Sequence, residues 1–122
     1  MITKKKKIRI IDFGFAANNK VTHSLYCGTP SYMAPEVLRE KGYEGEGVDV
    51  WALGVLLFKL LTGFYPFGGS SFIFDFSDSE DEKLKERILK VDLRMPECFG
   101  PMLKDLFSEI FLGDPNRRIT LN

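Results

Sequence analysis

The stretch that most constrains this 122-residue chain covers residues 48–61. It reads Val-Asp-Val-Trp-Ala-Leu-Gly-Val-Leu-Leu-Phe-Lys-Leu-Leu, and only Asp49 and Lys59 in it are ionisable. A helix that is apolar on every side has no face for water, so it lies inside a domain or a bilayer. A membrane span needs roughly 20 apolar residues, and this run is shorter and contains Lys59. The sequence therefore predicts a buried core helix with Asp49 in or just before its first turn, where a carboxylate favours the helix dipole.

Shorter elements are predicted before and after this helix. Residues 8–11 form a short β-type run that stops at the tripeptide Asp-Phe-Gly. Residues 15–30 have no helical period, and an unstructured loop of this length is typically functional or disordered. A short helix is predicted at residues 34–39 with Pro35 at its first position, and Gly63 is expected to end the core helix.

Two further helices are predicted after the core helix. Ser79 and Glu82 form an S-x-x-E capping box that opens the first of them. Its apolar stripe consists of Leu84, Ile88 and Val91. The last helix is expected to begin near Pro101 and to end at Gly113. Its buried side chains would be Leu103, Leu106, Phe107, Ile110 and Phe111. The predicted fold class is therefore mainly α, with a short β strand ahead of the helices.

Residues 72–79 combine aromatic and acidic side chains between flanks that have the composition of loops. We interpret them as a surface insertion whose aromatic side chains tuck partly onto the domain. The alternative is a patch that docks a partner, because exposed apolar patches often mark interaction sites.

Composition and charge exclude several classes of function. Seventeen basic and seventeen acidic residues give a formal net charge of zero, so neither nucleic acid nor an anionic membrane is expected as a partner. Cys27 and Cys98 lie far apart without metal-ligand spacing, which predicts free thiols and a cytoplasmic or nuclear location. No apolar segment typical of a signal peptide follows Met1. The oligomeric state is not predictable from these features.

Four motifs carry the chemical information. They are DFG at residues 12–14, GTPSYMAPE at 28–36, DVWALG at 49–54 and DPNRRIT at 114–120. The Asp12 carboxylate, at the end of the predicted strand, is a suitable ligand for Mg²⁺. The Phe13 side chain that follows can act as a packed plug that sets the direction of this carboxylate. In this order and at these distances the motifs resemble the C-terminal lobe of a eukaryotic protein kinase, which identifies residues 1–122 as a partial kinase domain. The Gly-Thr-Pro-x-Tyr motif resembles that of serine/threonine kinases. Within this class it is similar to the motif of the calcium/calmodulin-dependent and AMP-activated-like group.

The resemblance implies a role for each matching residue. Asp12 would chelate the Mg²⁺ that bridges the phosphates of ATP, and Phe13 and Gly14 would set the active or inactive orientation of Asp12. Thr29 would contact the catalytic aspartate through its hydroxyl group. Asp49 would hydrogen-bond the backbone of the catalytic loop.

Residues 15–36 would be the activation segment, which also forms the substrate pocket. Tyr26, Pro30 and Met33 would line the pocket for the substrate residue after the phospho-acceptor. Glu36 would pair with Arg118 and so tie the activation segment to the last loop of the chain. The implied partner is a protein substrate with a Ser or Thr acceptor, and the implied cofactors are Mg²⁺ and ATP.

Several parts of a kinase are missing from the sequence. The Gly-rich loop, the strand lysine and the H-R-D-x-x-x-x-N catalytic loop do not occur in it. We therefore expect a fragment of a serine/threonine kinase that is inactive alone and that exposes apolar surface on its core helix. The alternative is a non-catalytic, kinase-derived binding module that docks a kinase or a substrate. Coding DNA upstream of Met1 would distinguish the two, because only the first requires an open frame encoding the catalytic loop.

Overall fold

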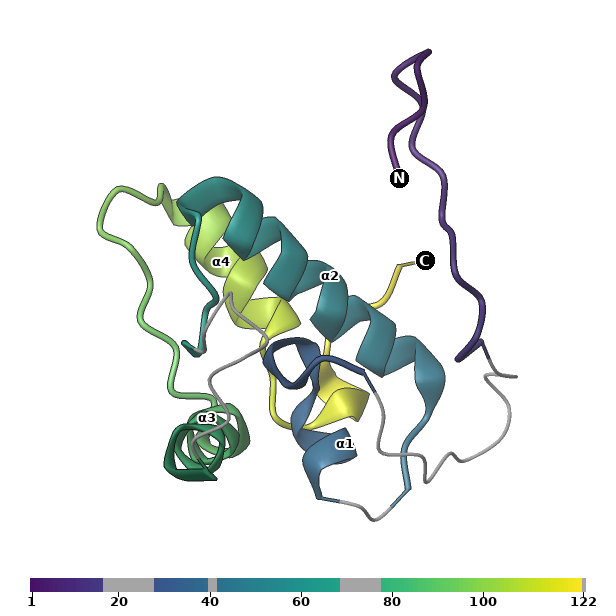
Figure 1. Ribbon diagram of the computed structural model, residues 1–122. Helices are drawn as coiled ribbons and strands as arrows, with labels where there is room; N and C mark the ends of the chain where they lie inside the picture. Colours follow the sequence, from purple (N-terminus) through teal and green to yellow (C-terminus); the bar gives the residue numbers. More distant parts are fainter. Residues whose placement is uncertain (17–27, 40–41, 69–77, 122) are drawn as a thin grey trace.

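The structure is a computed structural model that describes residues 1–16, 28–39, 42–68 and 78–121. The elements in chain order are η1 (Pro30–Tyr32), α1 (Pro35–Leu38), α2 (Gly45–Thr62), α3 (Asp78–Lys90), α4 (Pro101–Ile110) and η2 (Pro115–Arg117). Figure 1 shows α4 running beside α2, with α1 and α3 below them. The described part is mainly helical, as predicted.

The central helix is α2, and it is longer than the apolar run alone indicated. It begins at Gly45, so Asp49 lies in its second turn and not in its first, which corrects the prediction. It ends as predicted at Gly63, where φ is +81° and the backbone N–H donates to the Lys59 carbonyl over 2.8 Å. Glycine adopts this left-handed conformation without a steric penalty, which explains the stop.

One face of α2 is buried and the other is exposed. The buried side chains are Val50, Trp51, Val55 and Phe58. The exposed ones are Leu53, Leu56, Leu60 and Leu61, and Leu60 is 74% exposed. The prediction of a helix buried on every side is therefore wrong for this chain, because no described element covers the leucine face. The expected exposure of apolar surface on the core helix is confirmed.

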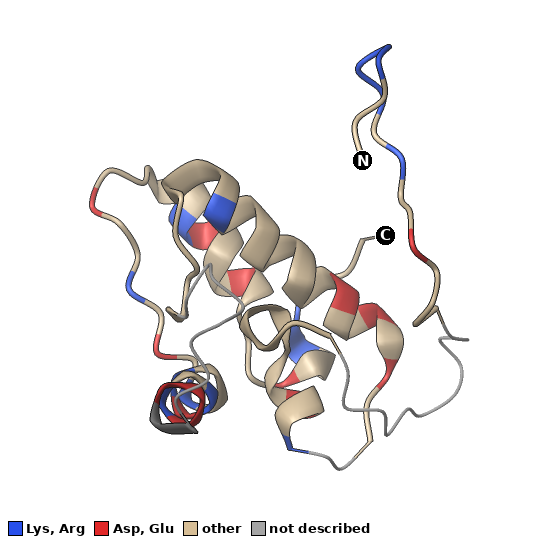
Figure 2. Cartoon of the chain, in the orientation of Figure 1, with Lys and Arg blue, Asp and Glu red and all other residues tan. Residues whose placement is uncertain are grey.

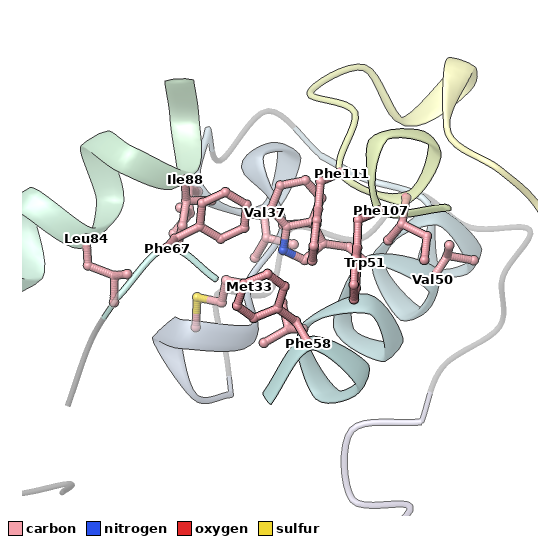
Figure 3. Close-up of a cluster of buried hydrophobic side chains, with 14 of the residues drawn as sticks. Met33, Val37, Val50, Trp51, Phe58, Phe67, Leu84, Ile88, Phe107 and Phe111 are labelled. Carbon is pink, nitrogen blue, oxygen red and sulfur yellow. The ribbon is translucent and has the colours of Figure 1, made fainter. Parts of the chain in front are cut away.

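Several aromatic rings pack against one another in the core (Figure 3). The Trp51 ring stacks on Phe67 at 5.2 Å and meets Phe111 edge-on at 5.0 Å. Phe107 stacks on Phe111 at 5.7 Å and meets Phe58 edge-on at 5.3 Å. Offset-stacked and edge-on pairs of this kind add stability beyond the apolar area that they bury. The cluster joins α2 to α4 and to the turn after α2.

Gly54 allows α2 and α4 to approach each other closely. A Cβ atom added there would collide with the Ile110 side chain and lie 3.2 Å from the Phe111 ring. A small residue is therefore required where the two helices cross. Phe107 and Ile110 of α4 and the following Phe111 are buried, as predicted, while Leu106 is 36% exposed.

The ends of α3 and α4 differ from the predictions. α3 begins at Asp78, which places Ser79 inside the helix and not at its N-cap. α4 ends at Ile110 and not at Gly113, because Phe111 leaves the helical conformation with φ −89° and ψ 59°. The predicted short helix at residues 34–39 is α1, with Pro35 at its first turn. Of the predicted insertion, residues 72–77 lie outside the described part of the chain.

The N-terminal segment projects away from the helices (Figure 1). The strand predicted at residues 8–11 appears only as a single antiparallel bridge between Ile2 and Ile8. Ile8 and Ile10 are each 82% exposed. A strand needs a neighbour to satisfy its backbone groups, and the described residues supply only this one bridge. None of the described helices is long and apolar enough to cross a membrane.

Candidate functional site

A buried ion pair between Glu36 and Arg118 holds the candidate site together. Arg118 Nη1 donates to Glu36 Oε1 over 2.7 Å, and Nη2 donates to Oε2 over 3.0 Å. The Arg118 side chain is fully buried and that of Glu36 is 8% exposed. A planar guanidinium matches a carboxylate in this bidentate geometry. The pair implied by the sequence resemblance is therefore present.

Arg118 also contacts two other parts of the fold, α2 and the loop after α4. Its Nη1 donates to the Gly47 carbonyl over 2.6 Å, and its Nη2 donates to the Leu112 carbonyl over 2.9 Å. Its Cζ atom lies 5.0 Å from the centre of the Trp51 ring, in a cation–π contact. One guanidinium therefore links α1, the first turn of α2 and the loop after α4.

Local turn chemistry places both members of the pair. Pro35 begins α1, where its missing N–H costs nothing and its fixed φ suits the helix. At the other end, Asp114 Oδ1 accepts the Asn116 backbone N–H over 3.0 Å and so caps η2. Arg118 follows η2 directly and points back into the core.

The residues predicted to form the substrate pocket divide between surface and core. We name residues 28–36 the substrate loop. Thr29 and Pro30 are exposed, whereas Met33 is buried in the hydrophobic core. Tyr26 lies outside the described residues. Met33 is therefore a core side chain in this structure and does not face an open pocket.

A cavity of about 300 Å³ lies between the substrate loop and α3. Its lining consists of Pro30, Leu38, Asp81, Glu82, Leu84, Lys85 and Ile88. The sequence analysis did not assign α3 to the site, although the Leu84 and Ile88 stripe indicated which face would pack. α3 carries charges of both signs around its axis (Figure 2).

Asp12 lies on the exposed N-terminal segment. Its φ is +63°, a left-handed conformation that Asp tolerates better than most residues, and its Oδ1 accepts the Gly14 N–H over 3.3 Å. Phe13 is 69% exposed, so the expectation of a packed plug is wrong here. The segment projects from the helices (Figure 1), and its Ile10, Phe13 and Phe15 side chains are exposed.

The single carboxylate of Asp12 provides only part of the ligands that Mg²⁺ needs. Mg²⁺ is commonly held by one or two carboxylates together with substrate phosphates and waters. Asp12 supplies one accessible carboxylate. Across the described ranges, no group of three His, Cys, Asp or Glu side chains forms a metal site. The residues therefore fit a magnesium ion that is shared with a nucleotide and do not fit one held by protein alone.

Asp49 lies exposed on the second turn of α2. The contact implied for it is with a catalytic loop that does not occur in the sequence, so its role stays a prediction.

A cluster of Tyr32, Tyr65 and Lys59 beside the substrate loop was missed by the sequence analysis. The Tyr32 and Tyr65 rings meet edge-on at 5.6 Å, and Lys59 Nζ lies 3.7 Å from the centre of the Tyr65 ring. Burial and the neighbouring Tyr65 raise the pKa of Tyr32, while the charge of Lys59 opposes that shift. The sequence analysis singled out Lys59 within the apolar helix but did not place the two tyrosine rings beside it.

Comparison with known proteins gives the class of the chain. The protein kinase domain family matches residues 1–122. The chain is 35% identical to CBL-interacting protein kinase 11 of Oryza sativa subsp. japonica, over 99% of this chain and 23% of that protein. It is 37% identical to an Aurora kinase of Dictyostelium discoideum, over 94% of this chain and 28% of that protein.

A third relative is CBL-interacting serine/threonine-protein kinase 5 of Arabidopsis thaliana, which is 34% identical over 99% of this chain and 26% of its own length. The chain belongs to the protein kinase domain family, in its eukaryotic serine/threonine class. It spans about a quarter of the length of these relatives.

Proposed function

We propose that this chain is the substrate-side part of a serine/threonine protein kinase that transfers the γ-phosphate of ATP to Ser or Thr in proteins. The observation that carries the proposal is the buried Glu36–Arg118 pair. It fixes the end of the substrate loop to the body of the lobe, which keeps Thr29 and Pro30 at the surface in a defined place. Phosphoryl transfer depends largely on positioning of this kind.

Individual residues of the chain have separate roles in the proposed reaction. Asp12 would hold the magnesium ion, and the ion, when bound with ATP, neutralises charge on the phosphates. The exposed Thr29 hydroxyl would position the catalytic aspartate, a residue that the sequence does not contain. The loop from Thr29 to Tyr32 would receive the substrate backbone. Without the nucleotide cradle and the catalytic base, the 122 residues alone are proposed to be inactive.

The proposal is tested by comparing two proteins. One is the 122-residue chain, and the other is translated from the longest open reading frame that contains it. Each is incubated with labelled ATP, Mg²⁺ and a mixture of Ser and Thr peptides. We expect transfer by the longer protein and none by the chain alone. Phosphate transfer by the chain alone would contradict the proposal that it is inactive without the nucleotide cradle and the catalytic base. Transfer by neither protein would favour the non-catalytic binding module.

We also propose a reducing compartment, the cytoplasm or the nucleus, for this protein. Cys98 is free and exposed, a state that is common where thiols are kept reduced. Fractionation of cells that express a tagged protein would check the location.

A further inference from the structure

We propose that the N-terminal hairpin, residues 1–9, is a binding site for the anionic surface of a lipid bilayer. We name these residues the basic hairpin. Two observations support the proposal: a cluster of exposed cations at its turn, and a pair of exposed isoleucines on one of its faces. The proposal goes beyond the proposed kinase function, and its test involves no phosphate transfer.

Backbone hydrogen bonds close the basic hairpin. The Arg9 N–H donates to the Met1 carbonyl over 2.9 Å, and the Met1 amino group donates to the Arg9 carbonyl over 2.9 Å. Closer to the turn, the Thr3 N–H donates to the Lys7 carbonyl over 2.9 Å. The chain therefore reverses direction over residues 4–6, which lie at the tip of the hairpin.

The basic hairpin concentrates positive charge at one end of the molecule. It carries five basic residues, the lysines at 4–7 and Arg9, and all five are exposed. Residues 1–11 contain no acidic residue, and no described carboxylate lies within ion-pair distance of the five cations. Figure 2 shows basic residues gathered at the tip of the projecting N-terminal segment, away from the helices. The net charge of zero predicts no membrane partner for the chain as a whole, but it averages over charges that are unevenly placed.

Two isoleucines lie next to this charge. Ile2 and Ile8 form the antiparallel bridge of the hairpin, and residues directly opposite each other in such a pair project to the same face. Their side chains are 72% and 82% exposed. Successive side chains of a strand alternate between its faces, so Lys7 and Arg9 project to the other face. The basic hairpin is therefore amphipathic, with an aliphatic face and a cationic face.

The surface of a bilayer is a partner for both faces. Anionic lipids attract clusters of lysines, and amphipathic segments bury their apolar side at the boundary between headgroups and acyl chains. Long lysine side chains reach the headgroups from a backbone that lies at this boundary. Nucleic acid offers phosphates to the same cations, but phosphate contacts do not bury a pair of isoleucines. Ile2 and Ile8 therefore favour the bilayer as the partner.

Vesicle flotation with the 122-residue chain tests the proposal. Vesicles of phosphatidylcholine alone are compared with vesicles in which about one-third of the lipid is phosphatidylserine. Vesicles rise in the gradient and carry only bound protein, so self-associated chains stay behind. We expect the chain to bind the anionic vesicles at least about tenfold more tightly than the neutral ones. The binding should weaken as the salt concentration rises, because salt screens the attraction.

Lysine variants assign the binding to the hairpin. Replacing the four lysines at 4–7 by Gln should weaken binding to the anionic vesicles at least about 100-fold. A control variant makes the same four changes outside the hairpin and should bind like the parent chain. Circular dichroism checks that both variants are folded. The four positions in the control are Lys83, Lys85, Lys90 and Lys104.

A second pair of variants tests the aliphatic face. Ile2→Ser/Ile8→Ser should weaken binding to the anionic vesicles about tenfold. Met102→Ser/Leu121→Ser removes two side chains that are 89% and 69% exposed elsewhere in the chain. This control should leave the binding unchanged.

Several results would overturn the proposal: no binding to either kind of vesicle, equal binding to both, or equal losses in the two lysine variants. Binding of a double-stranded DNA oligomer is measured in parallel by fluorescence anisotropy. If the chain binds DNA more tightly than anionic vesicles, and Ile2→Ser/Ile8→Ser changes neither affinity, the hairpin is a nucleic-acid site and the proposal is wrong. The proposed kinase function fails by a different result, the absence of phosphate transfer by the longer protein.

Discussion

Arg118 donates two hydrogen bonds to the carboxylate of Glu36, a residue 82 positions earlier in the chain. Its remaining described hydrogen bonds go to the carbonyl groups of Gly47 and Leu112. A single side chain thus connects the substrate loop, the start of α2 and the C-terminal turn. This arrangement anchors the buried end of the substrate loop at Glu36, while Thr29 and Pro30 near its other end are exposed.

Removing one partner of the pair should strongly destabilise the chain. Arg118→Ala leaves the Glu36 carboxylate buried without a partner, and we expect a loss of about 3–5 kcal/mol in the free energy of unfolding. Urea denaturation measures this loss. Arg117→Ala, at the exposed neighbouring position, is the control and should change the free energy by less than about 0.5 kcal/mol. Equal effects of the two substitutions would contradict the account.

Gly54→Ala should destabilise the contact between α2 and α4. The new methyl group would collide with Ile110 and crowd Phe111, at a cost of about 1–3 kcal/mol. Gly45→Ala is the matched control, because a Cβ atom there meets nothing within 4 Å. Thermal unfolding of both variants measures the difference. An unchanged midpoint for Gly54→Ala would show that the helices cross with more space between them.

Phe107→Ala should be among the most damaging substitutions in the core. The ring is fully buried and contacts Phe58, Phe99 and Phe111. Its removal leaves a cavity and should cost about 3–5 kcal/mol. Phe64→Ala removes the same side chain at a position that is 76% exposed, and we expect little change. Chemical denaturation of the two variants compares them, and similar losses would argue against the described core.

The exposed leucine face of α2 should promote self-association of the 122-residue chain. Replacing Leu60, which is 74% exposed, by Glu removes apolar surface from water without emptying a core site. We expect the double variant Leu53→Glu/Leu60→Glu to stay monomeric at concentrations where the parent chain associates. Light scattering after size-exclusion chromatography measures this. A large fall in the unfolding temperature of the variant would show instead that this face is packed.

Tyr32 should make stability depend on alkaline pH. Its pKa is raised above the ordinary value of 10.0, chiefly by burial and then by Tyr65. The folded chain therefore holds this proton more tightly than the unfolded chain does. The resulting stabilisation is complete below pH 10 and is lost as the pH rises through the folded-state pKa. Unfolding measured as a function of pH should show this loss, and Tyr32→Phe should reduce it. An identical pH profile for the variant would refute the assignment.

The sequence predicted the features that depend on local chemistry or on a family motif. Gly63 ends α2 because only glycine adopts its φ readily, and Pro35 begins α1 for a similar local reason. The Glu36–Arg118 pair was accessible only through the resemblance, since nothing local relates residues 82 positions apart.

Other features could not be predicted because they depend on tertiary packing. The exposure of Phe13 and of the α2 leucines reflects which elements are available to cover them. The contact between Lys59 and Tyr65 depends on the turn that follows Gly63. The early end of α4 is set by the conformation of Phe111, whose ring packs on Trp51 and Phe67.

The most direct test of the kinase account is phosphate transfer by the protein from the longest reading frame that contains this chain. Labelled ATP and a serine peptide are used, with and without Mg²⁺, and Asp12→Asn is compared with Asp105→Asn on the exposed face of α4. The account predicts Mg²⁺-dependent transfer that falls on the order of 100-fold in Asp12→Asn and is unchanged in Asp105→Asn. Transfer at the parent rate by the Asp12→Asn variant, or no transfer by the parent protein, would contradict it.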